Sequence, residues 1–191
     1  MLYHHIDSSK SDEHSVTGEP ALPGEISFIK GAHIGAVLSD PLVFEVDYPS
    51  REALPHFVGI TIPVFSTSLV ETFRSAGVEN FQVFPAVLRN PAIGAEWGGY
   101  WAFNVIGVLV AADLEKSNAD TILGGDPQGV SAPLLGFKEL VLEKKRARNM
   151  PMFRLAESPS ILLIHDHVLA HIKARRPPNG WGFEATEIET T

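Results

Sequence analysis

Residues 62–88, which read IPVFSTSLVETFRSAGVENFQVFPAVL, set the pattern of the fold that we expect. The hydroxyl side chains at positions 66–68 can accept hydrogen bonds from the free N–H groups of a helix start, and Glu71 lies three residues after Ser68, as in a capping box. Gly77 suits the left-handed end of a helix. Apolar side chains recur between these signals at the spacing of one helix face: Leu69, Val70 and Phe73. The apolar run at 81–88 then predicts a strand, so the stretch predicts strand, helix and strand.

A similar stretch occurs near the other end of the chain. Residues 161–164 predict a short strand, and Asp166 is the expected cap of a second helix within the run His165, Asp166 and His167. The apolar positions of this helix repeat the spacing of the first: Val168, Leu169 and Ile172. Residues 181–185 are a candidate strand. Two interpretations remain open, a true internal repeat and two similar modules assembled into one α+β sheet.

The remaining segments predict further strands separated by loops. The expected strands lie near residues 26–29, 42–46, 100–112, 140–142 and 152–155. Residues 124–133 predict a flexible loop, and the basic stretch 144–149 predicts a hairpin tip. The acidic residues after Phe183 are expected to fray.

These patterns predict an α+β fold, with a mixed or mainly antiparallel sheet and two amphipathic helices packed on it. A chain of 191 residues can bury one good core. We expect an N-terminal arm or loop at 1–24, a single α+β domain at 25–185 and a short acidic tail at 186–191.

Composition narrows the classes of function. The formal net charge of -8 disfavours direct binding of nucleic acid and suits a basic protein partner. The chain contains no cysteine, which excludes disulfides and zinc–thiolate sites. The N-terminal residues lack the pattern of a signal peptide, and no apolar run reaches the ~20 residues needed to cross a bilayer. We therefore expect a cytoplasmic protein that does not enter a membrane.

The sequence predicts no catalytic, cofactor-binding or metal-binding residues. His167 and His171 have the spacing of two helical metal ligands, but they lie beside the apolar face of their helix and no third ligand is evident. Phosphate-binding glycine loops and serine nucleophile motifs are absent. The basic cluster at 144–148 is expected to be a solvated turn. An enzyme of unfamiliar type that uses His165, Asp166 and His167 is the alternative.

Several polar residues adjoin apolar strands: Asn104, Asp113, Ser117 and Arg154. A buried charge needs partners, so we expect Arg154 to be structural, held by backbone carbonyls or by a carboxylate such as Asp113. Composition alone does not separate this role from a binding role.

The order of these motifs resembles that of a family of bacterial immunity proteins encoded beside polymorphic toxins. The matching pieces span residues 40–185 and are the helix entry PVFS at 63–66, GVENFQVFP at 77–85, FNV at 103–105 with Asp113 and Ser117, MFRL at 152–155, and GWGF at 180–183. The resemblance implies a small cytoplasmic α+β protein that binds and neutralises a cognate toxin without catalysis. The family tends to have a serine at the start of the second helix, where this chain has His165, Asp166 and His167.

The expected function is therefore toxin neutralisation by occlusion, in which the chain covers the active site of a toxin domain. The partner is expected to be a cognate toxin, with a basic nuclease as one hypothesis, and the oligomeric state is left open. The alternative from another class, besides an enzyme, is a non-catalytic scaffold or adaptor. The candidate partner-binding residues are Trp97, Tyr100, Trp181, Asp166 and Glu184. The three aromatic residues among them are equally explained as core or lid residues.

Overall fold

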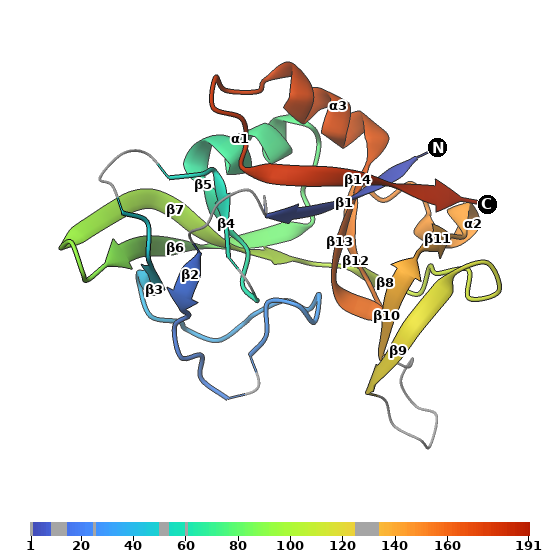
Figure 1. Ribbon diagram of the computed structural model, residues 1–191, viewed down its shortest axis with the longest axis horizontal. Coiled ribbons are helices and arrows are strands. Elements are labelled where there is room, and N and C mark those ends of the chain that lie inside the picture. Colours follow the sequence, from blue (N-terminus) through green and yellow to red (C-terminus); the bar gives the residue numbers. More distant parts are fainter. Residues whose placement is uncertain (1, 9–14, 25, 50–53, 60, 125–133) are drawn as a thin grey trace.

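The structure, a computed structural model, describes residues 2–8, 15–24, 26–49, 54–59, 61–124 and 134–191 (Figure 1). The helices in this part of the chain are α1 (Thr67–Ser75), α2 (Lys144–Ala147) and α3 (Asp166–Ala174). The strands are β1 (Tyr3–Ser8), β2 (Val16–Gly18), β3 (Leu42–Val46), β4 (Phe57–Val58), β5 (Val64–Ser66), β6 (Phe81–Asn90), β7 (Ala95–Val105), β8 (Val108–Leu109), β9 (Asn118–Gly124), β10 (Leu134–Glu139), β11 (Val141–Leu142), β12 (Met152–Leu155), β13 (Ser158–His165) and β14 (Phe183–Thr190).

The strands form two six-stranded mixed sheets and a separate two-stranded ribbon of β9 and β10. The strand order is β2-β3-β6-β7-β5-β4 in one sheet and β11-β14-β1-β13-β12-β8 in the other. Helices α1 and α3 lie together where the two sheets meet (Figure 1). The α+β prediction with two packed helices is confirmed.

Each six-stranded sheet contains the same unit. In the first unit the order is β3-β6-β7-β5-β4, in which β3 and β6 are parallel and the other neighbours are antiparallel. In the second unit the order is β11-β14-β1-β13-β12, with the same directions throughout. Helix α1 joins β5 to β6, and α3 joins β13 to β14. The similarity of the two helical stretches therefore belongs to a structural repeat, which the sequence had left open.

The central strand of each unit comes from a different part of the chain. In the first unit β7 follows β6 through the short turn between Asn90 and Ala95. In the second unit the same position, between β14 and β13, is filled by β1 from the N-terminal part of the chain. Because Tyr3 pairs with Ile188, the first strand and the last strand begin and end side by side (Figure 1).

The register of the two units also agrees at the helix starts. The Ser66 N–H donates to the His56 carbonyl at 2.8 Å, and the His165 N–H donates to the Pro151 carbonyl at 2.9 Å. Each of these bonds fixes the last residue of a strand just before a helix begins.

A buried tyrosine occupies the same place in each unit, opposite the residue that caps the helix. The Tyr100 hydroxyl donates to the Leu54 carbonyl at 3.1 Å, and the Tyr3 hydroxyl donates to the Ala147 carbonyl at 3.3 Å. Burial raises the pKa of each tyrosine to about 12. No sequence pattern links these two residues, since Tyr100 lies in a predicted strand and Tyr3 in a predicted arm.

The two units share one central core and each has an outer core of its own. The central core combines equivalent residues from both helices: Leu69, Val70, Phe73, Val168, Leu169 and Ile172. The outer core of the first unit includes Val16, Phe28 and Leu54, and that of the second includes Ala112 and Ala147. The predicted apolar faces of both helices are confirmed.

At α1 the predicted hydroxyl cap within positions 66–68 is confirmed, but the predicted capping box is wrong. The Ser66 hydroxyl, rather than that of Ser68, accepts the Leu69 N–H at 3.2 Å. Glu71 bonds to Arg74 instead of closing a capping box. Gly77 has the predicted positive φ, at 81°.

At α3 the predicted cap, Asp166, is wrong. The imidazole of His165 caps the helix by accepting the His167 N–H at 3.2 Å, and Asp166 is the first helical residue. Its carboxylate lies in the first turn, where the helix dipole favours negative charge.

Several other local predictions are wrong. Residues 26–29 form no strand, and 144–149 form the single-turn helix α2, ended by Arg148 and Asn149 with positive φ, instead of a hairpin tip. The run 100–112 is divided between β7 and β8. Residues 3–8, expected in an arm, form the internal strand β1, and the acidic residues after Phe183, expected to fray, form β14. The predicted loop at 124–133 lies almost wholly outside the described residues.

Candidate functional site

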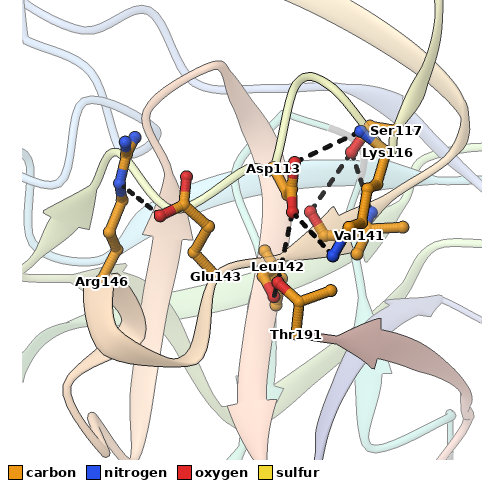
Figure 2. A network of polar contacts seen from close by, with 8 residues as sticks. All are labelled: Asp113, Lys116, Ser117, Val141, Leu142, Glu143, Arg146 and Thr191. Carbon is orange, nitrogen blue, oxygen red and sulfur yellow. Dashed lines mark hydrogen bonds and ion pairs between the residues drawn. The ribbon is translucent and has the colours of Figure 1, made fainter.

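Asp113, one of the motif residues, lies in a network of polar contacts at the end of the second sheet (Figure 2). One of its carboxylate oxygens accepts the Lys116 N–H at 3.2 Å, and the other accepts the Thr191 hydroxyl at 3.2 Å and lies 3.7 Å from the Lys116 ammonium. The Asp113 N–H donates to the Val141 carbonyl at 2.8 Å. The carboxylate therefore closes the turn that it begins and binds the residue after β14.

Ser117 completes the same network (Figure 2). Its hydroxyl donates to the Val141 carbonyl at 3.2 Å and accepts the Val141 N–H at 2.9 Å. The Thr191 N–H donates to the Leu142 carbonyl at 2.9 Å. Asp113 and Ser117 thus hold β11 against the start of β9 and the end of β14, and the polar groups of both residues bond within the chain.

The remaining ion pair in Figure 2 is exposed. Arg146 Nε lies 2.9 Å from a Glu143 carboxylate oxygen, with half of the arginine side chain exposed to solvent. A pair of this kind contributes about 0–1 kcal/mol to stability. This ion pair gives no indication of function.

Asn104, the second motif residue, is fully buried in the first unit. Its Nδ2 donates to the Ala32 carbonyl at 2.9 Å and to Gln82 Oε1 at 3.0 Å. Gln82 in turn accepts the Ile34 N–H at 2.8 Å and donates to the Ile34 carbonyl at 3.1 Å. This pair of amides therefore holds residues 32–34 on the outer face of the sheet.

Arg154, the third motif residue, is 2% exposed. Its Nη1 donates to the Pro159 carbonyl at 2.7 Å, while Nε and Nη2 have no hydrogen-bond partner. Burial lowers its pKa to about 10. The predicted bond to a backbone carbonyl is confirmed. Asp113, the carboxylate offered as an alternative partner, instead bonds Lys116 and Thr191.

Glu157 is a buried carboxyl that the sequence analysis missed. It lies in the turn between β12 and β13, and one of its oxygens accepts the Ala112 N–H at 3.1 Å. Burial raises its pKa, and its hydrogen bonds from backbone N–H groups oppose that shift. Its position after a predicted strand gave no signal, because turns commonly contain exposed glutamate.

The histidine cluster at the start of α3 is a set of helix-start contacts. His165 Nδ1 lies 2.7 Å from His167 Nδ1 and also accepts the His167 N–H. Burial, followed by the neighbouring His167, lowers the pKa of His165. Asp166 bonds to the buried His4, with 3.1 Å between His4 Nε2 and the carboxylate. The sequence did not indicate that His4 joins the cluster.

The same contact exists in the first unit with different residues. Trp101 Nε1 donates to the Thr67 hydroxyl at 2.9 Å. Trp101 and His4 each follow the buried tyrosine of their unit, and Thr67 and Asp166 are each the first residue of a helix. The His4–Asp166 pair therefore occupies a position that has a purely structural counterpart.

His167 and His171, the two histidines considered as metal ligands, contact different residues. His171 Nε2 is 2.8 Å from the Ser75 hydroxyl of α1, whereas His167 contacts His165. Among the residues that the structure describes, no three His, Asp or Glu side chains are arranged as metal ligands.

The candidate partner-binding residues fall into buried and exposed groups. Tyr100 and Trp181 are 9% and 8% exposed, and Trp181 Nε1 donates to the Ile172 carbonyl at 2.9 Å. Trp97 is half-buried against the outer core of the first unit. Asp166 and Glu184 are exposed. This placement favours the core alternative for Tyr100 and Trp181.

Comparison with family models places these motifs in a known context. The model of an immunity protein family, Imm11, matches residues 17–189. The chain belongs to the Imm11 immunity protein family. No curated protein sequence matches the chain. In the described part of the Imm11 chain, no helix is long and apolar enough to cross a membrane.

Proposed function

We propose that this Imm11 protein neutralises a cognate toxin domain by binding it and covering its active site, without catalysis of its own. Membership of an immunity protein family over residues 17–189 is the observation that carries the proposal. Binding to a toxin is what an immunity protein must do, and occlusion is the simplest way to block an active site from outside.

The contacts of the motif residues support a binding role over a catalytic one. Asp113, Ser117 and Asn104 all bond to backbone groups, so they maintain the fold rather than present free functional groups. The His165 imidazole accepts a helix N–H, which occupies the nitrogen that a general base would need. Affinity would then reside in surface residues, of which Trp97, Asp166 and Glu184 remain candidates.

The net charge of -8 supports a basic toxin domain, such as a nuclease, as the partner. Opposite charges accelerate encounter, and salt screens this effect, with a Debye length of about 8 Å at 0.15 M. We expect association to slow as salt is raised, while dissociation changes less.

The test is co-expression with the toxin domain encoded beside this gene, followed by co-purification and measurement of binding kinetics. Protection should require stoichiometric amounts of the Imm11 protein, because occlusion has no turnover. Protection at sub-stoichiometric amounts would favour an enzyme that modifies the toxin or its product. Absence of both protection and a complex would refute the immunity proposal.

A further inference from the structure

The outer faces of the two units differ at one equivalent place. In the first unit Gln82 lies opposite Asn104, and in the second Glu184 lies opposite Asp7. Each pair is four residues along its strands from the pair that contains the buried tyrosine, Tyr100 or Tyr3. The amide pair of the first unit is therefore replaced by two carboxylates in the second.

The amide pair has a partner within the chain. Gln82 and Asn104 hold residues 32–34 on the sheet through four hydrogen bonds to main-chain atoms and to each other. Phe84, the next residue on the same face of β6, packs edge-on against Phe28 with ring centroids 5.5 Å apart. This position of the unit can therefore dock a segment of chain through main-chain hydrogen bonds.

The carboxylate pair lies in the open. Asp7, Glu184 and Thr186, which is next on the same face of β14, are all exposed. We call these three residues the open face. The Asp7 carboxylate accepts the Ser8 N–H at 2.8 Å, and neither Asp7 nor Glu184 forms an ion pair with a cation among the residues that the structure describes.

Two like charges directly opposite each other on neighbouring strands destabilise a sheet. An ionised carboxylate only accepts hydrogen bonds, so this pair suits a segment that supplies donors and positive charge. Residues that cost stability and lie on an exposed surface are the kind that function retains.

We propose that the open face docks an extended, cationic segment of the toxin domain, in the place where the first unit docks its own residues 32–34. This inference rests on the proposed function and names the surface and the chemistry of the partner. Lysine or arginine side chains of the segment bond to Asp7 and Glu184, and its backbone runs along the exposed part of β1 and β14.

The test compares two double variants with the same change in charge. D7N/E184Q converts the open face into the amide pair of the first unit. E187Q/E189Q is the matched control, because Glu187 and Glu189 are exposed on the same strand β14 but alternate to its opposite face. Binding to a catalytically inactive form of the toxin domain is measured for both variants, together with thermal stability.

We expect D7N/E184Q to weaken binding about tenfold or more, and to leave the melting temperature equal to or above that of the wild type. The control should stay within about twofold of wild-type affinity. Equal weakening by both variants would assign the effect to overall charge, and unchanged binding by D7N/E184Q would exclude the open face; either result overturns the inference while the proposed function stands. If the wild-type chain neither binds nor protects, the proposed function fails and the inference fails with it.

Discussion

The two units of this protein build the same arrangement from chain that is continuous in one case and divided in the other. The first unit runs from β3 to β7 without interruption, whereas the second takes its central strand, β1, from residues 3–8. The positions of the capping bond, the buried tyrosine and the helix-start contact are nevertheless equivalent. Sheet geometry therefore depends on which strand fills a position and not on how that strand is connected.

The units differ in the side chains at two equivalent polar positions. The helix-start contact is Trp101 with Thr67 in the first unit and His4 with Asp166 in the second. The outer pair is two amides in the first unit and two carboxylates in the second. The second unit thus carries ionisable side chains in places where the first carries neutral ones.

We expect the removal of β1 to have the largest effect on folding. A chain without residues 2–8 loses the buried Tyr3 and Ile6, and it leaves the edges of β13 and β14 that face β1 without a partner strand. We expect no cooperative unfolding transition by circular dichroism.

A circular permutant provides the matching control. Joining residue 191 to residue 2 by a turn of about four residues, with new ends within 9–14, reproduces the connection between β6 and β7. We expect it to fold with a melting temperature near that of wild type. An unfolded permutant would show that the connection of β1 matters beyond its place in the sheet.

Truncation of equivalent core residues should give the next largest effects. Phe73 and Ile172 are both fully buried between the helices. Phe73→Ala should reduce the free energy of unfolding by about 3–5 kcal/mol and Ile172→Ala by about 2–5 kcal/mol, because each leaves a cavity. Urea denaturation measures both, with the exposed Lys173→Ala as control. If either truncation reduced the free energy of unfolding by less than Lys173→Ala does, the shared core would be contradicted.

The two tyrosines should give smaller and similar effects. Tyr3→Phe and Tyr100→Phe each remove a hydroxyl that donates to a backbone carbonyl, and each should cost about 0.5–1.5 kcal/mol. Since burial raises the pKa of both tyrosines to about 12, the unfolded chain ionises first and stability should fall as pH rises above 10. In each variant the melting temperature should fall less steeply as pH rises above 10. An unchanged decline would show that the tyrosine hydroxyls do not cause it.

The smallest effect concerns the caps. The lowered pKa of His165 means that the unfolded chain binds the proton more readily, so its contribution is complete above pH ~6.5 and is lost as pH falls. His165→Ser, which copies Ser66, should reduce the loss of stability between pH 7 and pH 5, measured by thermal melts. Part of the loss should remain, because burial also lowers the pKa of His56. An equal loss in the variant would show that the cap is not the titrating element.

Elements could be predicted where the pattern that defines them lies within one short stretch of sequence. Leu69, Val70 and Phe73 define a helix face within one stretch, and the same is true of Val168, Leu169 and Ile172. Arg154 was predictable as structural, because a charge between apolar strand residues needs a partner in the interior.

The missed elements depend on distant partners. Strand β1 contains His4, His5 and Asp7 and is unlike a core strand, yet it is held by β13 and β14 from the far end of the chain. The candidate strand at 181–185 covers only the start of β14, and the rest was missed because Glu184, Glu187 and Glu189 are among its exposed positions. The open face could be recognised only after the two units had been aligned by register.

The division of the second unit also affects the order in which the protein can be made. A ribosome adds residues from the N-terminus at about 5–20 per second, and domains generally fold as units during synthesis. The first unit is complete once β7 has emerged, whereas β1 must wait for β13 and β14, the last strands to be synthesised. Until then residues 3–8 have no partner strand, so the apolar side chains of Tyr3 and Ile6 stay exposed on the newly made chain while the first unit can already fold.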